Sequence, residues 1–262
     1  MPGRARLPRR RSSRVLALLA CLLWAPALAA CESTQQESAK IERYDKAHAP
    51  SLHSSSLSIT KPSSVVKVLG TALLSGEEAY AATVTMRNDS PHALSDVPIE
   101  ITVHGSNGQV LYTNKAPGIT GSLVSVPLLL PGEEFTWVDD QVQLGVGGSA
   151  KGATVAALLG EVPPVAKPAA SLPQMRISDV HSVEEAALGE ATAGTVSNPS
   201  PVTQEALVVY GVAERGGKVV AAGRAVLSQV GAHGSAPFQI FMIGSSGGGA
   251  KVELSAPAST LE

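Results

Sequence analysis

Residues 97–104, VPIEITVH, decide the fold of this chain, because their side chains alternate strictly in polarity. Val97, Ile99, Ile101 and Val103 fall on one face, and proline, glutamate, threonine and histidine fall on the other. Successive side chains of a β-strand point to opposite faces, so this pattern predicts a strand that is buried on one side.

Turn-forming stretches separate similar runs along the rest of the chain. They are RNDSPH (87–92), GSNGQ (105–109), LPGEE (130–134), SNPSP (197–201), RGGK (215–218) and GAHGS (231–235). Short strands with turn signals at this spacing predict an all-β sandwich or barrel. Beyond residue 56, only 182–191, SVEEAALGEA, offers even a weak helical pattern.

The pattern of strands and turns occurs twice. Residues 83–90 and 99–111 align with 193–200 and 208–220, and Asn88 and Asn198 are 110 residues apart. Self-similarity of this kind predicts two copies of one β-domain, at 57–160 and 174–262. The proline-rich segment 161–173 between them is predicted to be a semi-rigid linker.

The two copies share four local motifs. Each has a strand ending in N-x-S, an alternating strand, a hairpin of the form G-[KQ]-V, and a glycine shortly before a strand-opening phenylalanine. In these motifs the copies resemble the FxLYD-type, immunoglobulin-like domains of bacterial envelope lipoproteins. The resemblance covers residues 78–140 and 188–243. It implies two tandem immunoglobulin-like β-sandwich domains and says almost nothing about activity.

The N-terminus has the features of an export signal. Residues 1–14 carry six arginines and no acid, and residues 15–30 carry no charge. The apolar run is short for a membrane span and is interrupted by Pro26, so removal of residues 1–30 is expected. A twin-arginine signal is a weaker alternative, because two serines and an arginine displace the apolar residues that should follow the arginine pair.

Leu28–Cys31, LAAC, resembles the lipobox of bacterial lipoproteins. That resemblance implies a lipid on Cys31 and a mature chain held at the extracytoplasmic face of the cell membrane. Residues 31–56 are polar, with few large apolar side chains, and are predicted to form a flexible tether. The alternative is an ordinary secreted protein that is cut near Ala29 and retains a stray cysteine.

Cysteine count and charge restrict the chemistry further. Cys21 lies in the signal, so the body after Cys31 has no thiol nucleophile and no disulfide framework. The signal holds six of the 20 basic residues and none of the 22 acids, which leaves 14 basic and 22 acidic residues, a net charge of −8. An acidic surface of this kind does not favour nucleic acid as a partner.

No catalytic, cofactor-binding or metal-binding residue is predicted. The six histidines, at 48, 53, 92, 104, 181 and 233, lack the spacing of a metal site. Adjacent acids occur at 77–78, 133–134, 139–140 and 184–185, and solvated turns or strand faces are the expected setting for them. Neighbours on a strand point to opposite faces, so Asp139 and Asp140 could not converge on one bond, and a pair of acids from separate strands is the alternative. Residues 244–251, GSSGGGAK, do not match a phosphate-binding loop and are predicted to form a hairpin loop.

These observations favour a non-catalytic, membrane-anchored module that binds an envelope protein or a wall polymer, for example through an exposed strand edge. An accessory or chaperone-like subunit of an envelope assembly or export system is an alternative. An unrecognised hydrolase is another. Trp137, the only tryptophan after the signal, is expected in the core, with exposure for binding as the alternative.

Overall fold

The fold is all-β, as the alternation predicted. This computed structural model describes residues 57–77, 79–116, 118–145, 148–185, 189–245 and 249–262. The predicted signal, Cys31 and the predicted tether lie outside the described residues. Within the described part there is no α-helix, only the short 3₁₀ turns η1 (Gly121–Leu123) and η2 (Ala169–Ser171).

Residues 57–160, here called the first half, form two antiparallel sheets. Their strands are β1 (Val66–Ser75), β2 (Tyr80–Asn88), β3 (Leu94–His104), β4 (Val110–Thr113), β5 (Ser125–Leu129), β6 (Glu134–Val142) and β7 (Thr154–Leu159). One sheet has the order β1-β2-β6. In the other, β3 pairs with β4, β5 and β7.

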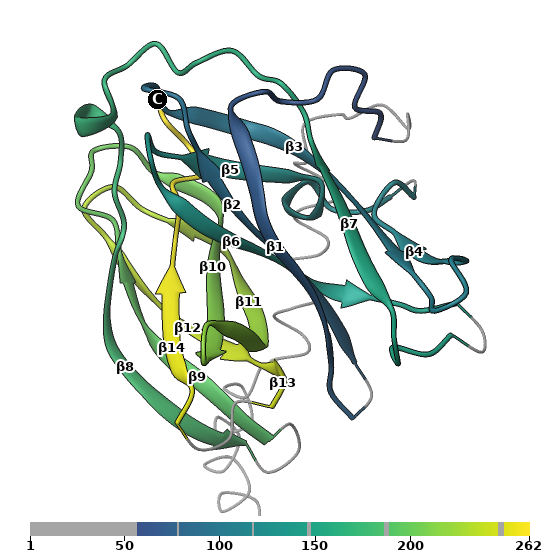
Figure 1. Cartoon of the computed structure of the whole chain (residues 1–262). Helices are drawn as coiled ribbons and strands as arrows, with labels where there is room; N and C mark the ends of the chain where they lie inside the picture. The colour runs from purple at the N-terminus through teal and green to yellow at the C-terminus, as the bar shows by residue number, and fades with distance from the viewer. Residues whose placement is uncertain (1–56, 78, 117, 146–147, 186–188, 246–248) are drawn as a thin grey trace, which may run out of the picture. The chain divides into compact units, whose positions relative to one another are not determined.

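Residues 174–262, the second half, repeat this pairing. Their strands are β8 (Arg176–Glu185), β9 (Gly189–Ser197), β10 (Gln204–Arg215), β11 (Lys218–Val230), β12 (Ser235–Phe241), β13 (Ile243–Gly244) and β14 (Lys251–Ser255). One sheet has the order β12-β9-β8 and the other β13-β11-β10-β14. The long strand β11 pairs with β10 as β4 and β5 pair with β3. Figure 1 shows β10 and β11 side by side.

Irregularities in strand pairing and backbone geometry occur at equivalent positions of the two halves, about 110 residues apart. Pairing shifts between Val68 and Gly70 in β1, and between Ser178 and His181 in β8. Asp96 in β3 and Ala206 in β10 both have a positive φ, of 51° and 47°. Because bulges of this kind fix the register of a strand, the two halves share a backbone plan as well as a turn pattern.

The asparagines of the two N-x-S turns are buried and make matching hydrogen bonds. Asn88 Nδ2 donates to the carbonyl of His92 at 2.8 Å and to those of Leu129 and Leu130. Asn198 Nδ2 donates to the carbonyl of Val202 at 2.8 Å and to two carbonyls at the end of β11. Each side chain closes its turn and satisfies carbonyls that burial would otherwise leave unpaired.

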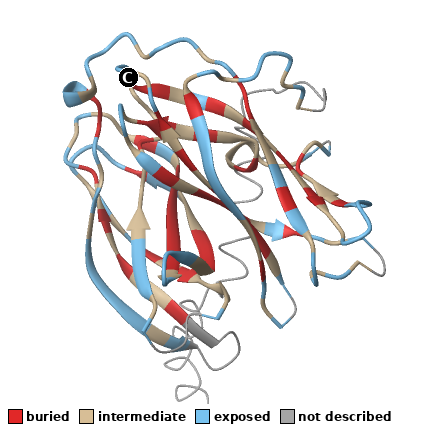
Figure 2. Cartoon of the chain, in the orientation of Figure 1, coloured by how far each residue is buried: buried red, intermediate tan, exposed pale blue. Residues whose placement is uncertain are grey.

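The largest apolar core draws on both halves. Val97, Ile99, Ile101 and Val103 of β3 are all fully buried in it, as the alternation predicted. Val208, Tyr210, Val212 and Ala222, from β10 and β11, belong to the same cluster, and β11 contacts β1, β2 and β6. Figure 2 shows buried segments running along β10 and β11 as well as along β3 and β6.

The segment that joins the halves is held by its own contacts. Val165 N donates to the carbonyl of Ala93 at 2.8 Å, and Glu161 N donates to the carbonyl of Lys61 at 2.9 Å. Leu172 is buried in a small cluster with Ala93, Leu128 and Ala258. These contacts fasten the proline-rich segment to the first half and to the C-terminal residues.

Candidate functional site

A buried polar cluster lies where strand β11 meets the first half. Arg224 stands in the otherwise apolar run of β11, and its side chain is only 2% exposed. Its Nε donates to Asp140 Oδ1 at 2.7 Å, and its Nη1 donates to Ser122 Oγ at 2.8 Å. Burial disfavours the charged guanidinium, but Asp140 offsets this, and the pKa of Arg224 lies above its usual value. The guanidinium therefore joins the two halves as a cation.

Asp139, the neighbour of Asp140, makes different contacts. The hydroxyl of Tyr112 donates to Asp139 Oδ2 at 2.7 Å, and Gln141 N donates to Oδ1 at 2.9 Å. Burial raises the pKa of Asp139 even though these two hydrogen bonds favour its charged form. Burial also raises the pKa of Tyr112, so the phenol keeps its proton and acts as a hydrogen-bond donor.

The two aspartates do not face each other across a common point. Asp139 is held by Tyr112 and by its own strand, and Asp140 is held by Arg224. The acids of the pair 133–134 also have separate environments: Glu133 accepts a hydrogen bond from Leu130 N, and Glu134 lies 3.6 Å from Arg87. The arrangement is therefore suited to joining strands, and it lacks the facing carboxylates that glycoside hydrolysis uses.

An aromatic contact lies in the same shared core. The rings of Phe135 and Tyr210 meet edge to face, with centroids 5.1 Å apart and an interplanar angle of 89°. Tyr210 is fully buried, and its hydroxyl has no hydrogen-bond partner among the described residues. Trp137 is also fully buried, and its Nε1 donates to the carbonyl of Ser122 at 3.3 Å. Tyr210 and Trp137 are therefore both core residues.

The sequence did not identify this cluster. Arg224 and Asp140 are 84 residues apart, and Tyr112 and Ser122 lie in different parts of the first half. A usable signal was present nonetheless, because an arginine inside the run VVAAGRAVL must find a partner when the strand is buried. That signal indicates burial with a partner and leaves the partner's identity open.

The described histidines do not gather. His92, His181 and His233 are exposed, and His104 is half-buried on the polar face of β3. Within the described ranges, no group of three or more histidine, cysteine or acidic residues is placed to hold a metal ion. The described residues include no helix long and apolar enough to cross a membrane.

The second half presents exposed strand edges. Strand β8 ends the sheet β12-β9-β8, and β14 ends the sheet β13-β11-β10-β14. All the side chains of residues 176–184 are exposed except Ile177 and Val183, and Figure 2 shows β8 largely in the exposed colour. Such an edge carries backbone donors and acceptors that a further strand can use.

The corresponding edges of the first half contact each other. Strand β1 packs beside β7, and the hydroxyl of Thr71 donates to the carbonyl of Val155 at 2.8 Å. The equivalent positions in the second half are His181 and Val252, and the ring of His181 instead contacts the carbonyl of Asp179. Val155 is 8% exposed, whereas Val252 is 40% exposed. The edges at β8 and β14 are therefore the more accessible pair.

No protein-family model matches this sequence, and no curated protein is similar to it at a significant level. The contacts described above are therefore what defines the candidate site.

Proposed function

We propose that this chain is a lipid-anchored, extracytoplasmic binding module, made of two immunoglobulin-like domains of the FxLYD type, and that it has no catalytic role. The exposed edge of β8 carries this proposal. It is a ten-residue strand at the end of its sheet, it is exposed along almost its whole length, and Val180 beside its bulge is 50% exposed. An extended segment of an envelope protein would add to this edge by β-augmentation.

The anchor supports this role because it fixes where the edge is presented. The export signal and the LAAC sequence favour attachment through Cys31. Treated as a flexible coil, the 25 residues that follow would extend about 25 to 30 Å. That reach is enough to hold the β-domains away from the lipid surface.

The binding edge is tested by photo-crosslinking in intact cells that naturally make the protein. A photoreactive residue at Val180 is compared with one at Leu69, which lies in the matching bulge of β1 and is 45% exposed. We expect a reproducible protein adduct from position 180 and at most a small fraction of it from position 69. Equal adducts from both positions, or none from either, would contradict β8 as the binding edge. Adducts to a wall polymer would also contradict the binding of an envelope protein at β8.

The anchor is tested separately by Cys31→Ser. We expect this variant to appear in the medium or to accumulate as unprocessed precursor, whereas the parent chain stays in the detergent-soluble membrane fraction. A Cys31→Ser chain of mature size that still fractionates with the membrane would exclude lipidation at this residue as the means of attachment.

A further inference from the structure

The outer edge of β14 is another open strand edge in the described part of the chain. β14 pairs with β10 along one side, and no described residue pairs with its other side. Lys251, Val252 and Glu253 are all exposed. A short, charged edge usually resists the addition of another strand, so the question is which strand could match these charges.

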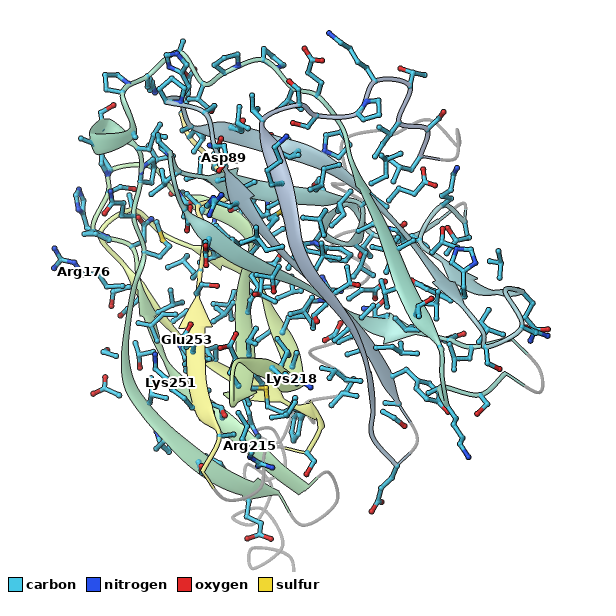
Figure 3. All side chains as sticks on the ribbon, in the orientation of Figure 1. Asp89, Arg176, Arg215, Lys218, Lys251 and Glu253 are labelled. Carbon is cyan, nitrogen blue, oxygen red and sulfur yellow. The ribbon has the colours of Figure 1, made fainter. Side chains whose placement is uncertain are left out.

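Lys251 and Glu253 are two residues apart, so they lie on the same face of β14, where they form an ion pair. Figure 3 shows both side chains projecting from this strand. If a second copy of β14 lies antiparallel, with a two-fold axis at Val252, each Lys251 stands opposite the Glu253 of the other copy. Opposite charges at directly facing positions stabilise a strand pair, and like charges destabilise it.

This pattern selects one register. A shift by two residues places Lys251 opposite Lys251, or Glu253 opposite Glu253, and both arrangements are repulsive. A shift by one residue exchanges the two faces of the strand. The register centred on Val252 also brings the two Val252 side chains together, which covers apolar surface that is exposed in the single chain.

The neighbouring strand adds to the same charge pattern. Glu214 of β10 faces Lys251 within the chain, and Val212 faces Glu253. Across the proposed junction, Lys251 would therefore lie between Glu214 of its own chain and Glu253 of the other. Each copy would gain two cross-strand ion pairs on one face, together with the backbone hydrogen bonds of a five-residue strand.

We propose that β14 is a self-association edge, and that two copies join there into one continuous antiparallel sheet of eight strands. The partner is a second copy because the Lys251-x-Glu253 pattern is complementary to itself. A five-residue junction is small compared with stable protein interfaces, so the dimer is expected to be weak and to depend on concentration. The proposal does not depend on the role given to β8.

Thiol crosslinking gives a direct test, because the body of the chain has no cysteine after Cys31. In the full chain with Cys21→Ser and Cys31→Ser, Val252→Cys is treated with a short thiol-to-thiol crosslinker. Val180→Cys, on the edge of β8, is the matched control. We expect at least tenfold more homodimer from Val252→Cys. Equal yields, or none from Val252→Cys, would refute the proposal.

Charge exchange tests the register and does not rely on the internal Lys251–Glu253 pair. Lys251→Glu and Glu253→Lys should each lower the yield of homodimer about tenfold in the Val252→Cys background, because like charges then face each other. A mixture of the two variants should restore crosslinking as a heterodimer, although neither chain keeps the internal ion pair. No recovery on mixing would contradict this register, and far-ultraviolet circular dichroism would confirm that each variant folds.

Discussion

Two tyrosines of the core, Tyr112, which is half-buried, and Tyr210, which is fully buried, have opposite hydrogen-bonding states. The Tyr112 hydroxyl donates to the buried carboxylate of Asp139, whereas the Tyr210 hydroxyl has no partner within the described ranges. Tyr210 contributes through its ring, which packs against Phe135. The hydroxyl groups of these two residues should therefore differ in what they contribute to stability.

Replacing each tyrosine by phenylalanine separates the ring from the hydroxyl. Tyr210→Phe should leave the free energy of unfolding unchanged or raise it slightly, because it removes an unpaired buried polar group. Tyr112→Phe should lower it by about 1.5 to 3 kcal/mol, because Asp139 loses a hydrogen bond to a charged acceptor. Urea denaturation measures both values, and a larger loss for Tyr210→Phe would contradict the hydrogen bonding described above.

Asp139 should give the protein a specific pH dependence. Its pKa is raised in the folded state by burial, so the folded chain binds the proton more tightly than the unfolded chain. The contribution of Asp139 to stability is therefore largest at low pH and declines as the pH rises through the folded-state pKa. The contribution is isolated by comparing the parent chain with Asp139→Asn.

Between pH 7 and pH 4, the stability of the parent chain relative to Asp139→Asn should increase as the pH falls. The measurement is the difference in the free energy of unfolding at a series of pH values. A difference that stays constant, or that shrinks toward low pH, would mean that the folded-state pKa of Asp139 is not raised.

At the level of the strands, sequence periodicity predicted some faces well and missed others. The alternation in β3 predicted which of its residues are buried, because one side of that strand meets the core. Strand β10 is buried on both sides, with Tyr210 in the shared core and Val209 in the core of the second half. Its nearly continuous apolar sequence indicates a buried strand but cannot reveal that the two sides serve different cores.

The candidate site was predictable only in part, for a related reason. A polar residue such as Arg224 inside an apolar strand signals a buried contact, but its partner depends on how the halves pack. The sequence also did not reveal which strand edges are open. Thr71 and His181 occupy equivalent positions, and only the structure shows that the threonine bonds across to β7 whereas the histidine bonds within its own strand.

Hydrogen exchange should distinguish the matching edge strands β7 and β14. Thr71 supports β7 from the side of β1, whereas β14 has no described neighbour on its outer edge. In dilute solution, backbone amides of β14 should exchange faster than those of β7. Raising the protein concentration should slow exchange in β14 and leave β7 unchanged, because only β14 would gain a partner strand. Concentration-independent exchange in β14 would contradict self-association there.

At the scale of the whole molecule, the shared core predicts that the two halves unfold together. Arg224 reaches across to Asp140 and Ser122, and residues of β10 and β11 complete the largest apolar cluster. Tryptophan fluorescence reports on the first half, because Trp137 lies in β6 and is the only tryptophan after the signal. A change in the second half that moves the Trp137 transition would therefore show that the halves are coupled.

Arg224→Ala should lower the free energy of unfolding by about 3 to 5 kcal/mol, because it leaves Asp140 without its buried partner. The loss should appear equally in Trp137 fluorescence and in circular dichroism of the whole chain. Lys61→Ala, which breaks an exposed ion pair with Glu161, is the control and should cost less than about 1 kcal/mol. An unmoved Trp137 transition in Arg224→Ala would mean that the halves unfold separately.

The shared core also sets an order of events during synthesis. The first half emerges from the ribosome before β10 and β11, yet Val208, Tyr210 and Ala222 are needed to complete its core. At roughly 5 to 20 residues per second, the 64 residues between Gly160 and Arg224 take about 3 to 13 s to follow. During that interval the side of Phe135 that packs against the Tyr210 ring has no partner. A nascent chain stalled near residue 160 should therefore need a chaperone, and one stalled well beyond residue 224 should not.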